Sequence, residues 1–308
     1  MAARGAKVKP RGGKPCISRR FGKPGANPYS GAMTIVQLED RAVLRIAGAD
    51  TRPFLQGLLT ADVDTLAPDR PLYAGLLSPQ GKALFDMMLF ADGDDVLVDV
   101  DAARVAALAK RLAMYRMRKA VTIETSLLAV FAGWDGGEAG QAPDARFAGL
   151  GARWLADDAG EAGAAVYDAH RLAVGVPGSA DIGEDQLLWL ETGADLLNGV
   201  SFTKGCYVGQ ENTARMHYRD KVRRRLVPVR FDGDPGDGII RDAVGRSAGT
   251  LRSHRGGAGI AHLRLEAAGG PLSLGGAPMS AARPAWLEPA LLAAVGPAVT
   301  GPAVTGPA

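Results

Sequence analysis

The apolar residues in the first half of the chain fall into short runs separated by turn-forming residues. The runs Leu72–Ser78, Ala83–Ala91 and Val96–Val100 predict three β-strands. They are separated by Pro79-Gln80-Gly81 and by Asp92-Gly93-Asp94-Asp95, whose residue types favour tight turns. Because tight turns join antiparallel neighbours, we expect the three strands to form a meander. Further strand-like runs are Arg41–Ile46, Val121–Glu124 and Leu128–Phe131.

Apolar residues at helical spacing predict helices around these strands. The apolar face of one such helix consists of Val105, Leu108, Leu112 and Tyr115. Asp101 precedes this helix and is its expected N-cap, because a short acceptor side chain satisfies the free N–H groups of a first turn. A shorter helix is expected to begin at Asp50 or Thr51 and to continue through Leu58.

After Arg225 the apolar runs are shorter and alternate with glycine-rich turns, which is typical of a small β-barrel. We therefore expect residues 226–284 to form a barrel and residues 33–225 to form the main body. Strands and helices alternate without a strict βαβ order, so the predicted fold class is α+β. The chain has no Gly-x-Gly-x-x-Gly sequence after a strand and no Walker A sequence, so neither a dinucleotide nor a nucleoside triphosphate is expected as ligand.

Composition and charge exclude several classes of protein. Of the 308 residues, 47% are hydrophobic and 22% are charged, as in a soluble globular protein. No run approaches the ~18 apolar residues that a membrane-spanning helix needs. Residues 1–32 carry eight basic side chains and no acidic one, so the rest of the chain has 28 basic and 33 acidic residues and a net charge of −5. The basic character therefore belongs to the N-terminal segment and not to the body.

Both ends of the chain are expected to lie outside the folded body. Residues 1–32 contain four prolines and are predicted to be a disordered basic extension of a cytoplasmic protein. The alternative is a transit peptide that directs the chain to the mitochondrial matrix, but such peptides are amphipathic and this segment is not. Residues 285–308 include a repeat of Gly-Pro-Ala-Val-Thr and are predicted to be a second disordered tail.

Two cysteines limit the chemistry of the chain. Cys16 and Cys206 are too few for a disulfide scaffold or for a zinc or iron–sulfur site with about four thiolates from one chain, and no resident metal is expected. Cys206 follows Lys204 by two residues and precedes a predicted helix that begins at Gln210. A nearby ammonium and a helix N-terminus both lower the pKa of a thiol, which indicates a nucleophile, a redox thiol or a single metal ligand. The alternative is a small buried side chain with a structural role.

A basic run follows this segment. Between residues 215 and 230, seven basic residues stand against Asp220 alone, a net charge of +6. Such a run suits a phosphate- or polyglutamate-bearing anion, or RNA. The alternative is a solvated connection to the barrel with arginines paired to the acidic body, and the interleaved aromatic residues of single-strand binders are missing. The basic residues are Arg215, Arg219, Lys221, Arg223, Arg224, Arg225 and Arg230.

The sequence from Lys204 to Glu211, KGCYVGQE, resembles the signature of the YgfZ family. Members of that family are folate-binding, aminomethyltransferase-like proteins that assist the maturation of iron–sulfur enzymes. Further blocks in the same order extend the resemblance over residues 40–265. The blocks are Gly48-Ala49-Asp50 with Phe54–Asp62, Leu77–Lys82 leading to Asp86, Tyr115–Arg118, Asn198–Phe202, and Tyr218-Arg219 with Arg223–Leu226.

This resemblance implies two α+β subdomains and a C-terminal β-barrel around a central cleft that binds tetrahydrofolate or a one-carbon derivative. It implies that Cys206 and Asp86 are the chemically active residues and that Asp86 lies near the folate. The folate-binding residues it implies are Asp86, Glu191, Lys204, Gly205, Tyr207, Gly209, Gln210, Glu211 and Arg219. One position departs from the pattern. Where related aminomethyltransferases tend to have Arg-x-Glu-x-Gly, this chain has Ala173, so the pterin would lose a carboxylate unless Glu191 supplies it.

The resemblance favours a non-catalytic factor that binds folate and iron–sulfur client or carrier proteins, and that matures or repairs four-iron enzymes through Cys206. One alternative is a folate-dependent aminomethyl or one-carbon transferase, which would use a positioned carboxylate such as Asp86. Another is an RNA-binding protein related to tRNA modification, which would use the basic run. The maturation factor is preferred because Cys206 lies in the most specific motif and the transferase glutamate is missing. A nucleic acid partner is not favoured, and no membrane partner is expected.

Overall fold

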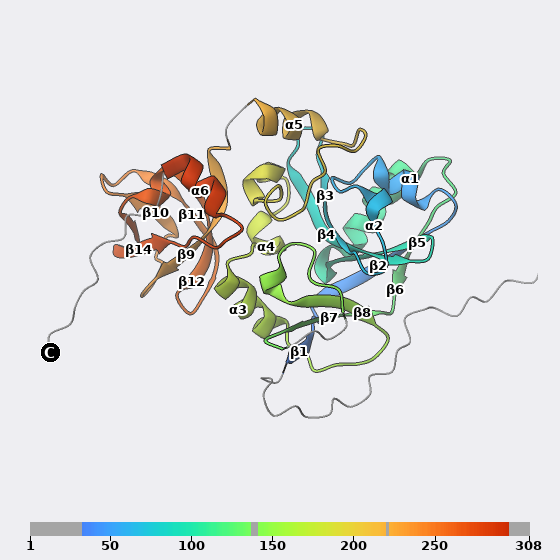
Figure 1. The fold of residues 1–308 in the computed structure, drawn as a ribbon. Helices are drawn as coiled ribbons and strands as arrows, with labels where there is room; N and C mark the ends of the chain where they lie inside the picture. The colour runs from blue at the N-terminus through green and yellow to red at the C-terminus, as the bar shows by residue number, and fades with distance from the viewer. Residues whose placement is uncertain (1–32, 137–140, 220–221, 296–308) are drawn as a thin grey trace, which may run out of the picture.

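The computed structural model describes residues 33–136, 141–219 and 222–295. In this part of the chain, two antiparallel sheets and a closed barrel are combined with six α-helices, which confirms the α+β class (Figure 1). The two predicted tails lie largely outside these ranges. The helices are α1 (Thr51–Gln56), α2 (Val105–Arg116), α3 (Ala164–Val174), α4 (Ser179–Ile182), α5 (Gln210–Tyr218) and α6 (Glu288–Val295).

The larger sheet has five strands in the order β3-β4-β5-β2-β6. The strands are β2 (Arg41–Ala47), β3 (Leu72–Leu77), β4 (Ala83–Asp92), β5 (Asp95–Asp101) and β6 (Thr122–Ser126). β3, β4 and β5 are consecutive antiparallel neighbours, so the predicted meander is confirmed. Asp101 at the end of β5 accepts a hydrogen bond from Ala103 N at 2.9 Å. It therefore caps the 3₁₀ turn that leads into α2.

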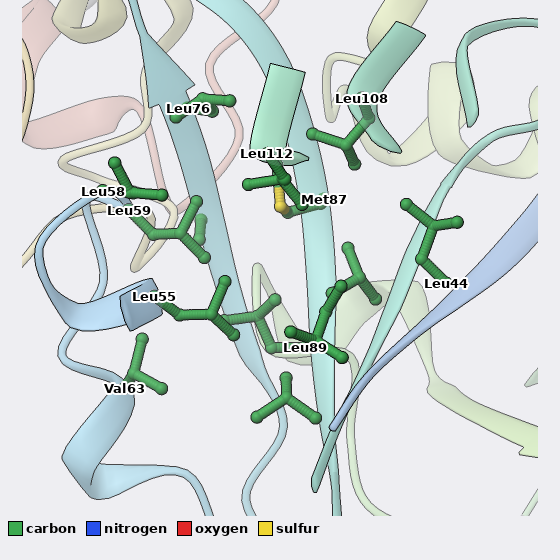
Figure 2. Packing of buried hydrophobic residues seen from close by; sticks show 14 of the residues in the cluster. Leu44, Leu55, Leu58, Leu59, Val63, Leu76, Met87, Leu89, Leu108 and Leu112 are labelled. Carbon is green, nitrogen blue, oxygen red and sulfur yellow. The ribbon is translucent and has the colours of Figure 1, made fainter. Parts of the chain in front are cut away.

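Helices α1 and α2 cover one face of this sheet. Leu108 and Leu112 of α2 are buried against Leu44, Met87 and Leu89 of the strands (Figure 2). Leu55 of α1 belongs to the same cluster. The helical spacing of the α2 leucines had predicted this face. Removing water from so many apolar side chains is the main force that holds the helices on the sheet.

The smaller sheet packs near the opposite face of the larger one. Its strands, in the order β1-β7-β8, are β1 (Thr34–Gln37), β7 (Ala129–Trp134) and β8 (Ala152–Ala156). Val43 of β2 and Leu97 of β5 join Val36, Val130 and Leu155 in one buried cluster. Successive side chains of a strand point to opposite faces, so Val43 faces this cluster while the neighbouring leucine of β2 faces α2.

The C-terminal barrel is closed by six strands in the order β10-β11-β12-β9-β14-β13, with β10 also paired to β13. They are β9 (Arg224–Phe231), β10 (Ile239–Asp242), β11 (Ser247–Arg255), β12 (Ala258–Arg264), β13 (Leu272–Leu274) and β14 (Ala277–Ala281). β9 begins two residues before the expected boundary at 225/226. The expectation of a disordered tail from residue 285 is wrong for residues 285–295. Trp286, Leu287 and Leu291 are buried in the barrel cluster, and the last two lie in or next to α6.

A fourth apolar cluster joins the larger sheet to the barrel. Trp189 is fully buried, and its Nε1 donates a hydrogen bond to Gly199 O at 3.0 Å. A Cβ at Gly75 of β3 would lie 2.8 Å from the Trp189 ring, so the strand needs glycine at this contact. Leu226 and Ile260 of the barrel belong to the same cluster. Among the described residues, no helix is long and apolar enough to cross a membrane.

Candidate functional site

Lys204 ties the KGCYVGQE segment to the end of α1. Its Nζ donates hydrogen bonds to the carbonyl oxygens of Gln56 (2.7 Å), Leu59 (2.7 Å) and Ala61 (2.8 Å). Carbonyls at a helix C-terminus lack partners within the helix, so the ammonium satisfies groups that would otherwise need water. Burial lowers the pKa of Lys204 to about 8, although two nearby carboxylates act in the opposite direction.

Tyr207 and Gly209 fix the other end of the loop. Tyr207 is buried in the cluster around Trp189, and burial raises the pKa of Tyr207 to about 12. Gly209 has a φ of +83°, and a Cβ there would lie 2.5 Å from Ser78 O in the turn between β3 and β4. The loop therefore rests directly on this turn, at a position where only glycine fits without strain.

Cys206 lies between these two anchors and is exposed to solvent, so the expectation of an accessible thiol is confirmed. The Lys204 ammonium is directed to three backbone carbonyls, and so it is not the free counter-ion that the sequence suggested for this thiol. A Cβ at Gly205 would meet no other atom within 4 Å, so close packing does not require glycine at this position. An exposed single thiol is able to supply one metal or cluster ligand, or to form a mixed disulfide.

An aromatic cluster lies next to the loop in the chain. The ring centroids of Phe202 and His217 are 3.6 Å apart and the rings are nearly parallel. Tyr218 is 67% exposed and meets both rings edge-on. The sequence block Asn198–Phe202 included Phe202 but did not predict its stacking on His217, because a pair from two separate segments leaves no local pattern. Gln210 and Glu211 form the first turn of α5, and Arg219 is the exposed residue at its C-terminus.

Asp86 lies in a cavity of about 120 Å³ whose lining does not include Cys206. Asp86 is on β4, beyond Ala83, whereas the Cys206 loop contacts the turn that precedes β4. The expected single cleft containing both residues is therefore replaced by two separate features. The charged residues that line the cavity are Asp40, Arg41, Asp86, Asp101, Arg146, Arg153, Asp168 and Arg171.

The four arginines of this cavity are already engaged by buried carboxylates. The hydrogen-bonded pairs are Arg41 with Asp99 (2.6 Å), Arg153 with Asp99 (2.7 Å), Arg146 with Asp144 (2.7 Å) and Arg171 with Asp181 (2.7 Å). Burial alone would lower the pKa of Arg41, but the charges of Asp99 and Asp86 raise it overall. Because each guanidinium group is paired with an aspartate of the fold, it is less available to bind an anionic ligand.

Asp86 is only 7% exposed, and neither a hydrogen bond nor an ion pair joins its side chain to another described residue. Asp40 lines the cavity but is an exposed residue, and it forms no ion pair within the described chain. Partial burial of its carboxyl group raises the pKa of Asp40, although Arg41 and Arg153 oppose this. Burial and the charge of Asp86 also raise the pKa of Tyr73 well above its usual value. The unused hydrogen-bonding capacity of the cavity includes the carboxylate acceptors of Asp86 and Asp40, which suit a ligand with N–H donors, and the Arg153 Nη2 donor.

Glu191 and Ala173 do not line this cavity. The Glu191 carboxylate accepts a hydrogen bond from Leu188 N at 3.2 Å and lies 3.7 Å from Nε2 of His262 in the barrel. Ala173 is exposed near the end of α3. Glu191 therefore contacts the barrel and does not line this cavity. Asp40, which sequence analysis missed, is the second cavity carboxylate without an ion-pair partner.

Part of the basic run serves the fold. Arg225 is buried and donates to Asp195 at 2.6 and 2.8 Å and to Leu190 O at 2.7 Å. Arg230 donates to Ala173 O at 2.8 Å. For Arg225 the structural alternative, an arginine paired to an acidic residue of the body, is confirmed, whereas the hydrogen-bond partners of Arg230 are backbone carbonyls. Lys221 lies outside the described residues.

The two sheets and the closed barrel define a protein of the aminomethyltransferase-like fold. The crystal structure of glycine cleavage system aminomethyltransferase T from Bartonella henselae superimposes with a TM-score of 0.66 at 13% identity, over 82% of this chain and 85% of that chain. Residues 223–289 match the family described as CAF17, C-terminal beta-barrel domain.

Two mammalian relatives identify the family. The iron-sulfur cluster assembly factor IBA57, mitochondrial, of Mus musculus is 34% identical over 306 residues, which cover 84% of this chain and 86% of the relative. The human protein of the same name is 36% identical over 296 residues, with 82% and 83% covered. The chain therefore belongs to the IBA57 family of iron–sulfur cluster assembly factors, within the YgfZ/CAF17 group.

Proposed function

We propose that this chain assists the maturation or repair of four-iron enzymes and that Cys206 contacts the cluster or the client protein. The names of its relatives as iron–sulfur cluster assembly factors support this function. The observation that carries it is the exposed Cys206 on a loop that Lys204 and Tyr207 hold at both ends. A loop fixed in this way loses little conformational entropy when a partner binds.

One thiol supplies one ligand, so the proposed contact with a cluster needs further ligands from a carrier or client protein. Among the described residues, no group of three or more His, Cys, Asp or Glu is gathered as a metal site. The partly exposed rings near the loop support a protein partner, since aromatic residues are enriched at protein interfaces. The chain would act as an accessory factor without catalysis of its own.

Cluster transfer in a purified system tests this proposal. A cluster-loaded carrier protein, an apo four-iron enzyme and the full chain are incubated, and the recovered enzyme activity is measured. Wild type is expected to increase the recovered activity, and Cys206→Ala is expected to lose the increase. Thr203→Ala, which alters a neighbouring exposed side chain, serves as the control and is expected to match wild type. Full activation by Cys206→Ala would overturn the role of the thiol.

We further propose that the cavity with Asp86 receives the pterin head group of tetrahydrofolate or a one-carbon derivative. A pterin presents amino and ring N–H donors, and the carboxylates of Asp86 and Asp40 are the matching acceptors. The volume of about 120 Å³ is below the ~300–1,000 Å³ of ordinary small-molecule sites, so the remainder of the folate would lie outside. Asp86 would orient the ring. Asp40 would supply the carboxylate that related aminomethyltransferases have at the position of Ala173.

Calorimetric titration with tetrahydrofolate tests this part independently of the thiol. Binding is expected for wild type and for Cys206→Ala, and a loss of at least about tenfold in affinity is expected for Asp86→Asn. Asp237→Asn on the barrel surface is the matched control. Equal affinities of wild type and Asp86→Asn would remove the assignment.

Two further assays with the purified chain test the alternative functions, a one-carbon transferase and an RNA-binding protein. Transfer of a methylene group to tetrahydrofolate by the purified chain would establish a transferase, and its absence supports the accessory role. RNA binding through the basic run would weaken steeply with salt. The engagement of Arg225 and Arg230 within the fold argues against such a face.

We propose a mitochondrial location. The relatives are named as mitochondrial proteins and give no support to the expected cytoplasmic location. Residues 1–32 lie outside the described chain, so their role as a transit peptide rests on their basic, acid-free composition alone. Import of the full chain into isolated mitochondria, compared with a chain that begins at Met33, tests this location.

A further inference from the structure

A basic surface with two exposed methionines lies at the C-terminal end of α2. From Lys110 to Thr122 the chain carries five cationic side chains and no acidic one. Met114 and Met117 are 60% and 87% exposed. The residues of this surface neither line the Asp86 cavity nor belong to the Cys206 loop. It includes the Tyr115–Arg118 block, to which the proposed function assigns no role.

The backbone at Met117 holds this side chain outward. Met117 follows the last residue of α2 and has φ 49° and ψ −114°, a conformation that is costly for any residue except glycine. Helices often end on glycine at such a position because glycine carries no Cβ. Here the strained position carries a flexible apolar side chain that faces solvent. Methionine adapts its shape to irregular apolar surfaces, which suits it to contact with a partner.

An open groove of about 690 Å³ lies beside Met117, between residues 47–49 and 116–122. Its two walls are joined by the Asp50 carboxylate, which accepts a hydrogen bond from Ala120 N at 2.7 Å. Gly48 has φ +125°, and a Cβ there would lie 2.1 Å from Ala120 O. The walls therefore approach each other at a position that requires glycine, so the groove is a defined feature of the fold.

Charge indicates what this groove binds. Lys110, Arg118 and Lys119 form no ion pair with another described residue, whereas the arginines around the Asp86 cavity are all paired. We propose that the groove is a docking surface for an acidic segment of a partner protein that also carries apolar side chains. The exposed methionines favour a protein over RNA, because the surface offers no exposed aromatic ring for base stacking. This inference goes beyond the proposed function and does not depend on Cys206.

Fluorescence anisotropy with the full chain tests the docking surface. The probes are a short peptide that mixes glutamate and leucine, an oligoglutamate of equal charge, and a single-stranded RNA of similar length. Wild type is expected to bind the mixed peptide more tightly than oligoglutamate. The double variant R118E/K119E is expected to weaken this binding by about tenfold or more, since two attractive charges become repulsive. Met117→Ala is expected to remove the preference for the mixed peptide.

The control variant R70E/R241E reverses two exposed charges elsewhere and is expected to bind like wild type. Absence of peptide binding by wild type, or equal weakening by the control, would overturn the proposal. Tighter binding of RNA than of the mixed peptide would also overturn it and assign the face to nucleic acid. Met117→Ala changes only an exposed side chain and is expected to fold. If the charge-reversed variant does not fold, the peptide preference of Met117→Ala still tests the proposal.

Discussion

The ammonium of Lys204 lies 2.7 Å from the carbonyl oxygen of Leu59, a residue 145 positions earlier in the chain. Through this contact, the loop that carries Cys206 is fixed to the end of α1. A lysine that the sequence associated with thiol chemistry therefore acts as a tether between two distant segments. Its burial has consequences for stability that depend on pH.

Lys204→Met is expected to reduce the free energy of unfolding by about 1–3 kcal/mol, because three backbone carbonyl oxygens lose their hydrogen-bond donor. The effect depends on pH because burial lowers the pKa of Lys204 to about 8 in the folded chain. The unfolded chain has an ordinary lysine pKa near 10.4, so between these values it binds more protons than the folded chain. Stability of wild type relative to the variant must therefore rise from pH 8 to pH 10. Urea denaturation of both proteins at several pH values measures this, and a constant difference would contradict it.

Gly209 and Gly205 belong to the same motif but are expected to respond differently to substitution. Gly209→Ala places a Cβ 2.5 Å from Ser78 O at a φ of +83°, so a loss of at least about 1–3 kcal/mol is expected. Gly205→Ala meets open space and is expected to leave the melting temperature close to that of wild type. Thermal denaturation of the two variants compares them directly. Equal destabilisation would show that the loop does not rest on the β3–β4 turn as described.

Asp86→Asn separates binding from stability. The neutral amide removes the solvation cost of a buried carboxylate that has no hydrogen-bond partner, but it also removes the attraction between Asp86 and Arg41. These two effects oppose each other, so the melting temperature is expected to stay close to that of wild type. Tetrahydrofolate binding, in contrast, is expected to weaken. Calorimetry and thermal denaturation on one preparation give both quantities. A loss of more than about 2 kcal/mol of stability would instead assign Asp86 to the framework of the cavity.

Asp99 is expected to be essential for the fold of the cavity wall. It is fully buried between Arg41 and Arg153, so Asp99→Asn leaves two buried guanidinium groups without their carboxylate. Removing one partner of a buried ion pair costs about 3–5 kcal/mol. The exposed Arg241–Asp237 pair is the control, and Asp237→Asn is expected to cost less than about 1 kcal/mol. Similar costs for the two variants in urea denaturation would contradict this ranking.

Periodicity was sufficient to predict the meander and the buried face of α2, because both arise from local patterns of apolar residues. It failed for β8 (Ala152–Ala156), which lies in a stretch rich in glycine, alanine and aspartate. It also failed for α6, whose buried Leu287 and Leu291 immediately precede a repeat without core-forming side chains. Short apolar clusters at the margin of a low-complexity segment give a weak signal on their own.

The motif favoured an accessible Cys206 over a small buried side chain, and the structure leaves this residue exposed. The sequence did not predict the surroundings of Asp86, because Asp40 and Arg146 come from separate segments that only the fold brings together. The role of Lys204 was missed for the same reason: its acceptors lie far away in the sequence. Glu191 has suitable chemistry for a pterin but lies next to His262 of the barrel, a contact that the sequence could not predict.

The activity of a four-iron enzyme in cells tests the central claim most directly. The wild-type gene is replaced by Cys206→Ala or by Thr203→Ala, and enzyme activity is measured at matched levels of the expressed chain. The account predicts that four-iron enzyme activity falls with Cys206→Ala and is maintained with Thr203→Ala, while both variants fold like wild type. Normal four-iron enzyme activity in Cys206→Ala cells would contradict it.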